Sequence, residues 1–281
     1  MNVLQTKDYF HSDEHAIGLF IMMNQPVENV HAHEFDELVI VFNGGGFHIC
    51  NDKVSFINKG DCFFVSATDV HNYESTNNLS IINLLIKKER NFKYLQNIDV
   101  LLKEVKVATQ GSNADINTLN DEALRYILHC VDSILMQQEN DYDEKHFSQI
   151  ECAFFSIINT IIHAKVQSKQ SEQKYVKIIR QFCDNYYQGV NVRLISKMNG
   201  IGQRTLYRVI KEITGLTPER FLQRIRLLKA REMIRTTDKS INKIAFDCGF
   251  SNATRLSEAY KQHFSRAPSD EYYIIESNPV R

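Results

Sequence analysis

The sequence predicts an α+β protein in which a small N-terminal β-barrel with flanking helices precedes an all-α domain. Short runs rich in Val, Ile and Phe alternate with turn residues over positions 17–87. Helical periodicity then starts near residue 119 and continues almost to the end of the chain. The charge divides as well: residues 1–173 contain 13 Lys+Arg and 24 Asp+Glu, whereas residues 174–281 contain 20 and 10. The near-neutral total of −1 therefore hides an acidic and a basic part.

The β region contains six apolar runs with polar or glycine-rich breaks between them. The runs cover residues 17–23, 37–42, 47–50, 53–57, 62–67 and 79–86, and the breaks are residues 44–46, 51–52, 58–60 and 77–78. Gly, Asn and Asp favour turns, so each break predicts a reversal between two strands. Short strands at nearly regular spacing predict a barrel or jelly roll.

Two amphipathic helices follow the strands. The first covers 119–138 with Asn120 as its cap, and the second covers about 146–166. Both have too much apolar surface to stand free, so they pack on the barrel, on each other or on a second subunit. Residues 165–174 are mostly polar and predict a linker. We therefore expect a sensing and dimerisation domain at 1–166, a linker at 167–174 and a second domain at 175–281.

The second domain repeats one pattern, a short helix followed by a glycine turn and another helix. The first copy joins 192–198 to 203–213, and the second joins 241–248 to 251–263. A helix over 175–188 that ends at Gly189 precedes them, and a last helix starts at 267–270. Thr217, with Pro218 at the first helical position, caps a helix to about Arg235 that lies between the two copies. Helix-turn-helix units place the start of their second helix in the major groove of DNA.

The basic charge of this domain favours the same function, because Lys and Arg attract the phosphates of DNA. At about 1.5 Å per residue, the connecting helix is long enough to hold two reading helices near successive major grooves. We expect DNA contacts from the first turns of the two reading helices, with Ser251 also acting as a cap. These residues are Gln203, Arg204, Thr205, Arg208, Ser251, Asn252, Thr254 and Arg255. The expected core positions are Leu206, Ile210, Ile244, Ala245, Phe250, Leu256 and Tyr260.

These segments resemble the AraC/XylS family of bacterial transcription regulators. The matching stretches are RTLYRVIKEITGLTPE (204–219), RIRLLKAREMIR (224–235), INKIAFDCGFSN (241–252) and APSD (267–270). Ser196 stands where the family usually has Ala, and Ser265 where it usually has Gly. Outside residues 90–165 the chain is most similar to the regulators of L-rhamnose operons. That resemblance implies an activator that contacts double-stranded DNA and RNA polymerase and responds to a small-molecule inducer, such as a sugar. We expect the amphipathic helices around 120–162 to carry dimerisation, so the expected form is a homodimer.

A histidine pattern in the first domain is similar to the metal-binding motifs of cupin barrels. His31, His33 and Glu37 are followed by Gly44, and Gly60-Asp61 is followed by His71. Two or three His with a carboxylate make a plausible set for a divalent metal. AraC-type regulators share this pattern without a metal, however. We therefore expect no metal and no other cofactor, and hydrogen bonds to a polar ligand from His31, His33, Glu37, His71 and Tyr73.

Several function classes are disfavoured by the sequence. No apolar run approaches the ~20 residues that span a bilayer, and the N-terminus lacks a signal-peptide pattern. The six Cys show no CxxC, which is typical of reduced thiols in a cytoplasmic protein. We expect a transcription regulator and not an enzyme. The alternatives are a metal-dependent cupin enzyme fused to a DNA-binding module, and a regulator that responds to a non-sugar signal.

Overall fold

A computed structural model describes residues 2–10, 14–27, 29–89, 92–109, 117–138, 144–164, 170–187 and 190–272. The chain forms two compact units. One comprises Met1–Cys50 with Ile57–Gln173, and the other comprises Asn51–Phe56 with Lys174–Arg281. Each unit is described by itself.

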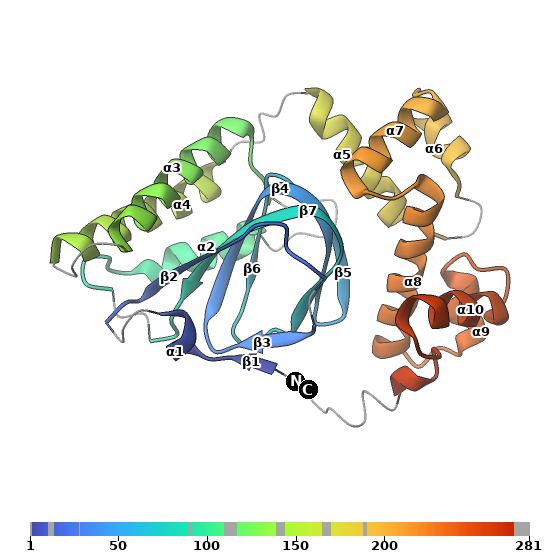
Figure 1. The fold of residues 1–281 in the computed structure, drawn as a ribbon, viewed down its shortest axis with the longest axis horizontal. Helices are drawn as coiled ribbons and strands as arrows, with labels where there is room; N and C mark the ends of the chain where they lie inside the picture. The colour runs from blue at the N-terminus through green and yellow to red at the C-terminus, as the bar shows by residue number, and fades with distance from the viewer. Residues whose placement is uncertain are drawn as a thin grey trace. The chain divides into compact units, whose positions relative to one another are not determined.

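Within the described residues, the strands form one eight-stranded sheet that curls on itself, and all of it except residues 53–56 belongs to the N-terminal unit (Figure 1). The strands are β1 (Asn2–Leu4), β2 (Ile17–Met22), β3 (His31–His33), β4 (Asp36–Cys50), β5 (Lys53–Asn58), β6 (Asp61–Val65), β7 (His71–Ile86) and β8 (Asn117–Thr118). Their order is β1-β3-β7-β4-β6-β8, with β2 paired to β7 and β5 paired to β4. The long strands β4 and β7 pair antiparallel and form the centre of this sheet.

The expected turns at residues 44–46 and 77–78 are wrong, because both segments lie inside long strands. β4 continues through the three glycines and β7 continues through Asn77 and Asn78, while their pairing shifts register between Val41 and Phe47. Gly44 has φ +65°, and a Cβ there would lie 2.2 Å from the Asn78 carbonyl oxygen. A β-bulge uses the same Gly and Asn conformations as a turn, so composition does not separate the two.

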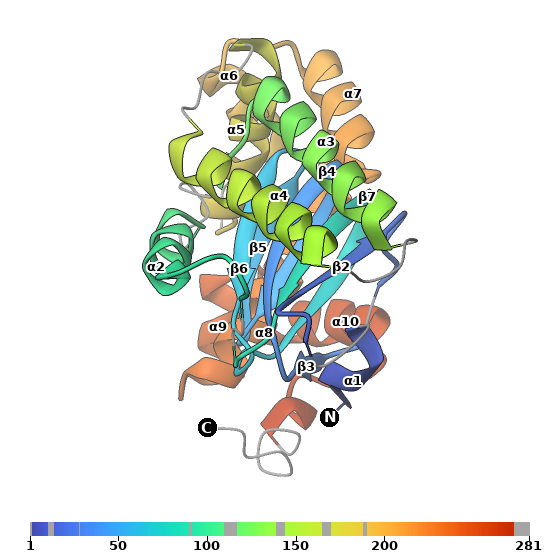
Figure 2. The same ribbon diagram turned by 90° about the vertical axis from the view of Figure 1, so that its left-hand side faces the viewer.

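In the described part of this unit the helices are α1 (Thr6–Tyr9), α2 (Ile98–Thr109), α3 (Asp121–Gln138) and α4 (Glu144–His163). The cap at Asn120 is confirmed, since its Oδ1 accepts from the Ala123 N–H at 2.8 Å. α3 and α4 lie together across one face of the sheet (Figure 2). Ile127 and Ile157 share one buried cluster with Leu38 and Ile82 of the sheet. The two helices therefore pack on the sheet and on each other, which confirms two of the three packing alternatives that the sequence left open. The sequence patterns did not reveal α1 and α2.

Helices make up most of the described part of the C-terminal unit. They are α5 (Gln170–Asp184), α6 (Val192–Met198), α7 (Gln203–Thr214), α8 (Pro218–Thr236), α9 (Ile241–Asp247) and α10 (Ala253–Phe264). α5 starts five residues before the expected helix and ends four residues before Gln188. Its first turn thus occupies residues that were expected to be linker, while 165–169 and Gly189 lie outside the described residues. The helix expected from 267 is helical over 270–272, and the chain beyond Tyr272 is also outside them.

The N-terminal caps of the helices in this unit were predicted correctly in two cases and wrongly in one. Thr217 and Ser240 cap α8 and α9 as expected. The cap of α10 is Asn252 and not Ser251, because the Asn252 side chain accepts from the Arg255 N–H at 2.9 Å. Asn and Ser are equally good N-caps. Because both types occur here in succession, the sequence alone does not indicate which residue caps the helix. All seven expected core residues are buried: Leu206, Ile210, Ile244, Ala245, Phe250, Leu256 and Tyr260.

Candidate ligand pocket and DNA-reading helices

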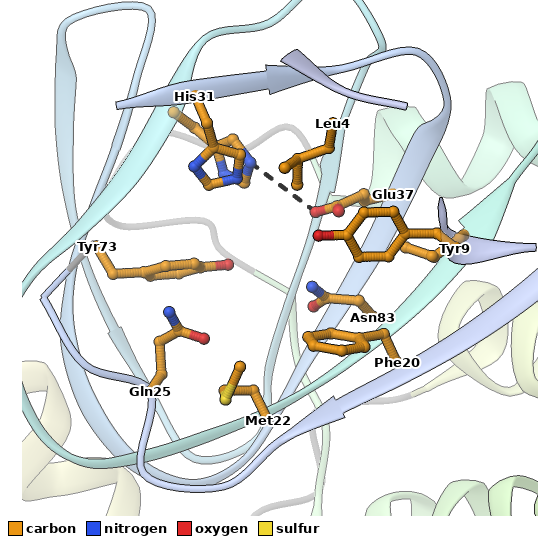
Figure 3. A pocket seen from close by; sticks show the side chains of 11 residues that line it. Leu4, Tyr9, Phe20, Met22, Gln25, His31, Glu37, Tyr73 and Asn83 are labelled. Carbon is orange, nitrogen blue, oxygen red and sulfur yellow. Dashed lines mark ion pairs between the residues drawn. The ribbon is translucent and has the colours of Figure 1, made fainter. Parts of the chain in front are cut away.

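The N-terminal unit contains a pocket with a mixed polar and apolar wall (Figure 3). Residues from α1 and from strands β1, β2, β3, β4 and β7 converge on it. The lining is Leu4, Tyr9, Phe20, Met22, Gln25, His31, Glu37, His71, Tyr73, Asn83 and Leu85. The hydroxyl ends of Tyr9 and Tyr73 point toward each other across the space (Figure 3). Pockets that combine apolar walls with a few polar groups are the usual form of small-molecule sites.

Four of the five residues expected to bind a ligand line this pocket. His31, Glu37, His71 and Tyr73 do so, and the pairing of β3 with β7 sets His31 opposite His71. His33 lies behind them, with its Nε2 3.8 Å from Glu37 Oε2. Their role in ligand binding stays a prediction.

Three polar lining residues were missed by the sequence patterns: Tyr9, Gln25 and Asn83. Asn83 interrupts an apolar strand and is buried, which is a signal that could have been used. Tyr9 and Gln25 lie outside the histidine pattern that starts at His31, and only the fold shows that they reach the pocket.

Burial favours the neutral form of three histidines at or beside the pocket, His33, His48 and His71. Desolvation by burial is the main reason that the pKa of His33 is lowered, that of His71 is well below its usual value, and that of His48 falls to about 3. His33 Nδ1 contacts the carbonyl oxygen of Phe35, and His48 Nε2 lies 3.1 Å from His71 Nδ1. Each neutral ring offers one donor and one acceptor nitrogen. The pocket can therefore exchange hydrogen bonds with hydroxyl groups without burying extra positive charge.

The helix predicted to read DNA first, α7, has exposed cationic side chains in its first two turns. Gln203, Arg204 and Arg208 are exposed and Thr205 is half-buried, so the structure places these four expected contact residues on an accessible surface. The preceding turn is fixed by Ser196, whose hydroxyl donates to the carbonyl of Ile201. This bond explains how Ser replaces the usual Ala at that position.

The second reading helix, α10, presents a less cationic start. Ser251, Asn252, Thr254 and Arg255 are all exposed, but the Asn252 side-chain oxygen is used by the cap. Arg255 lies 3.3 Å from Glu258, an acidic neighbour on the same helix. The α10 surface is therefore less attractive to phosphates than that of α7.

Comparison with known proteins gives the family. Residues 195–271 match a helix-turn-helix domain model, and residues 22–150 match the AraC-like ligand binding domain. The chain is 33% identical to the HTH-type transcriptional activator RhaS of Mannheimia succiniciproducens over 95% of this chain and 97% of that protein. The chain belongs to the AraC family of transcription regulators. It is 29% identical to RhaS of Enterobacter sp. strain 638, over 96% of both chains.

Membership of the AraC family assigns the two units their functions. The C-terminal unit is a helix-turn-helix domain that binds DNA, and the N-terminal unit is a ligand-binding domain. The protein is a transcription regulator, as its sequence predicts. Among solved structures, ToxT from Vibrio cholerae O395 is 15% identical over 93% of this chain and 98% of that chain. Its TM-score of 0.37 is too low to add to the family assignment. Within the described residues, no helix has both the length and the apolar character needed to cross a membrane.

Proposed function

We propose that this AraC-family regulator activates transcription when a sugar, with L-rhamnose as the first candidate, binds in the pocket of the N-terminal unit. Two of its full-length relatives carry the name of transcriptional activators. The similarity to L-rhamnose operon regulators supports the choice of sugar. As a regulator of bacterial type it would act in the cytoplasm, and as an activator it would contact RNA polymerase.

The chemistry of the pocket is the observation that carries this proposal. Glu37 accepts hydrogen bonds, while the amides of Gln25 and Asn83 both donate and accept. Phe20, Met22 and Leu85 add an apolar part to the wall. A sugar with several hydroxyls and a methyl group has surfaces that match both parts. L-Rhamnose is such a sugar.

Ligand binding would control DNA binding through a change in population. A ligand shifts a protein between two states only by its difference in affinity for them. We propose that the domains act as predicted, with 1–166 sensing, 167–174 as the connection and 175–281 reading DNA. We also propose a homodimer whose subunits meet at α3 and α4. Tyr126 and Phe155 leave exposed apolar surface on these two helices.

A sugar screen with a pocket variant tests the proposal. Full-length protein is titrated with L-rhamnose, L-mannose and D-glucose while the DNA that it binds is sequenced. L-Rhamnose should raise both the melting temperature and the occupancy of a defined DNA sequence. Gln25→Ala should weaken the response about tenfold, whereas Gln149→Ala removes an exposed glutamine of α4 and should change nothing. If no sugar changes either readout, the signal is not a sugar.

The enzyme alternative predicts a different result. Relatives named as activators favour regulation over catalysis. L-Rhamnose incubated with the protein should therefore be recovered unchanged, as measured by NMR. Turnover of the sugar would instead support a catalytic N-terminal unit.

A further inference from the structure

We propose that His33, Glu37 and His71 bind one divalent first-row transition-metal ion beside the ligand pocket. Their candidate ligand atoms all lie within 4.8 Å of one another, and the three side chains are buried. Glu37 Oε2 is 3.8 Å from His33 Nε2 and 3.9 Å from His71 Nε2. The proposal concerns a site for a cation and holds whether or not a sugar is the effector.

The protonation state of His33 is the first argument. Its Nδ1 faces the carbonyl oxygen of Phe35, which can only accept, so the ring proton is on Nδ1. In a neutral imidazole the other nitrogen, Nε2, then carries a lone pair. That lone pair faces the carboxylate of Glu37, and two acceptors that face each other in a buried site repel. Among the described residues, His33 Nε2 has no hydrogen-bond partner. A cation between the two groups would remove the repulsion.

His71 supports the same interpretation from the neighbouring strand. Its Nδ1 lies 3.1 Å from His48 Nε2, and a proton on Nδ1 that is donated to His48 leaves the lone pair on Nε2. Within the described part of the chain, His71 Nε2 also has no hydrogen-bond partner. Metal-binding histidines usually donate their second ring N–H to a neighbouring acceptor, which fixes the orientation of the ring. Phe35 and His48 would provide this support for His33 and His71.

The environment keeps both imidazoles ready to bind a metal. Burial lowers the pKa of His33 and places that of His71 well below its usual value, so protons do not compete for the lone pairs at neutral pH. The carboxylate of Glu37 would provide the negative charge that a divalent ion requires in a buried site.

The donor set indicates which metals fit. Two imidazoles and one carboxylate suit Zn²⁺, Co²⁺, Ni²⁺ or Fe²⁺, whereas Ca²⁺ and Mg²⁺ prefer oxygen ligands. Metal–ligand bonds of about 2.0–2.2 Å place neighbouring donors of a tetrahedral site about 3.4 Å apart. The distances of 3.8 and 3.9 Å from Glu37 to the two histidines need to shorten by a few tenths of an ångström. The two histidine nitrogens lie within 4.8 Å of each other, so they need to approach by up to about 1.4 Å. Glu37 and His71 also line the pocket, so water or a ligand hydroxyl would complete the coordination from that side.

Metal titration of the full-length protein without an affinity tag tests the proposal. Chelator-treated protein is titrated with CoCl₂ and with ZnCl₂ at pH 7.5, with no sugar present. We expect one Co²⁺ per chain with visible d–d absorption, displacement by Zn²⁺, and a higher melting temperature with either ion. Glu37→Gln and His33→Gln should each weaken binding more than 10-fold. His129→Gln removes an exposed histidine of α3 and should bind like the wild type.

Two further measurements guard against unfolded variants and weak surface binding. Circular dichroism shows whether each variant keeps its fold, and His48→Phe, which leaves all three ligands in place, should weaken binding about 10–100-fold through the loss of orientation. The proposal is overturned if the wild type binds neither ion stoichiometrically. It is also overturned if a folded Glu37→Gln variant binds Co²⁺ as tightly as the wild type does.

Discussion

Replacement of Arg204 by Ala should remove base discrimination from one half of the DNA site. Arg204 is the second residue of α7 and is exposed, so its loss leaves the fold intact. A bidentate contact from Arg to guanine is worth about 1–3 kcal/mol, which corresponds to a loss of about 5–150-fold in affinity for the specific site. Affinity for unrelated DNA should change much less.

The geometry of α7 makes the expectation specific. Arg204 and Arg208 lie one turn apart, and four residues at about 1.5 Å correspond to about 6 Å along the helix axis. Base pairs are about 3.4 Å apart, so the two side chains would read positions about two base pairs from each other. Arg204→Ala and Arg208→Ala should relax the sequence preference at these two different positions.

The assay is binding to a randomised DNA library at two salt concentrations. Lys211→Ala is the matched control, because it removes an exposed cation from the last turn of the same helix. It should lower affinity for all sequences alike and reduce the salt dependence by about one phosphate contact. If Arg204→Ala behaves as this control does, Arg204 contacts a phosphate and the assignment of base reading is wrong.

Three further predictions follow from the packing. Leu256→Ala, at a fully buried position of α10, should lower the free energy of unfolding by about 2–5 kcal/mol in a denaturant titration, whereas the exposed Thr254→Ala should cost under about 0.5 kcal/mol. A loss of equal size in both would contradict the burial of Leu256. Gly44→Ala and Gly200→Ala both place a side chain at positive φ, which costs about 1–2 kcal/mol. Of the two, only a side chain at position 44 would collide with a backbone oxygen. Gly44→Ala should therefore lower the melting temperature clearly more than Gly200→Ala does. Similar melting temperatures for the two variants would argue against the bulge. Burial raises the pKa of Cys183 and Cys248 to about 12, so both thiols stay protonated from pH 7 to 9 and should resist iodoacetamide, while the exposed Cys152 should react, as read by mass spectrometry. Alkylation of Cys183 in folded protein would contradict its position in the core.

The helices of the C-terminal unit could be predicted well because their signals are local. Caps such as Thr217 and Ser240 and the apolar spacing of Leu206 and Ile210 depend only on neighbouring residues. The wrong predictions occurred where one local sequence suits two different local structures equally well. Asn252 replaced Ser251 as a cap, and Gly44 forms a bulge instead of a turn.

The pocket could be predicted only in part, because its residues come together through long-range strand pairing and not through a local sequence pattern. His31, Glu37 and His71 belong to a pattern whose members lie on three different strands, so a resemblance to known families was needed to group them. Tyr9 and Gln25 belong to no pattern, and only the long-range pairing of β2 and β3 with β7 brings their segments to the pocket.

Arg226 of α8 makes contacts that connect both halves of the DNA-binding unit. Its Nε donates to the carbonyl of Tyr186 at 2.7 Å, in the segment that follows α5. A Cβ on Gly249, in the turn between α9 and α10, would lie 2.8 Å from the same nitrogen and 2.9 Å from the same carbonyl. The chain that follows α5 thus lies in close contact with the turn that precedes α10. Any side chain in place of Gly249 would displace Arg226 or the chain that follows α5, so glycine at this position keeps the start of the second helix-turn-helix pair close to both.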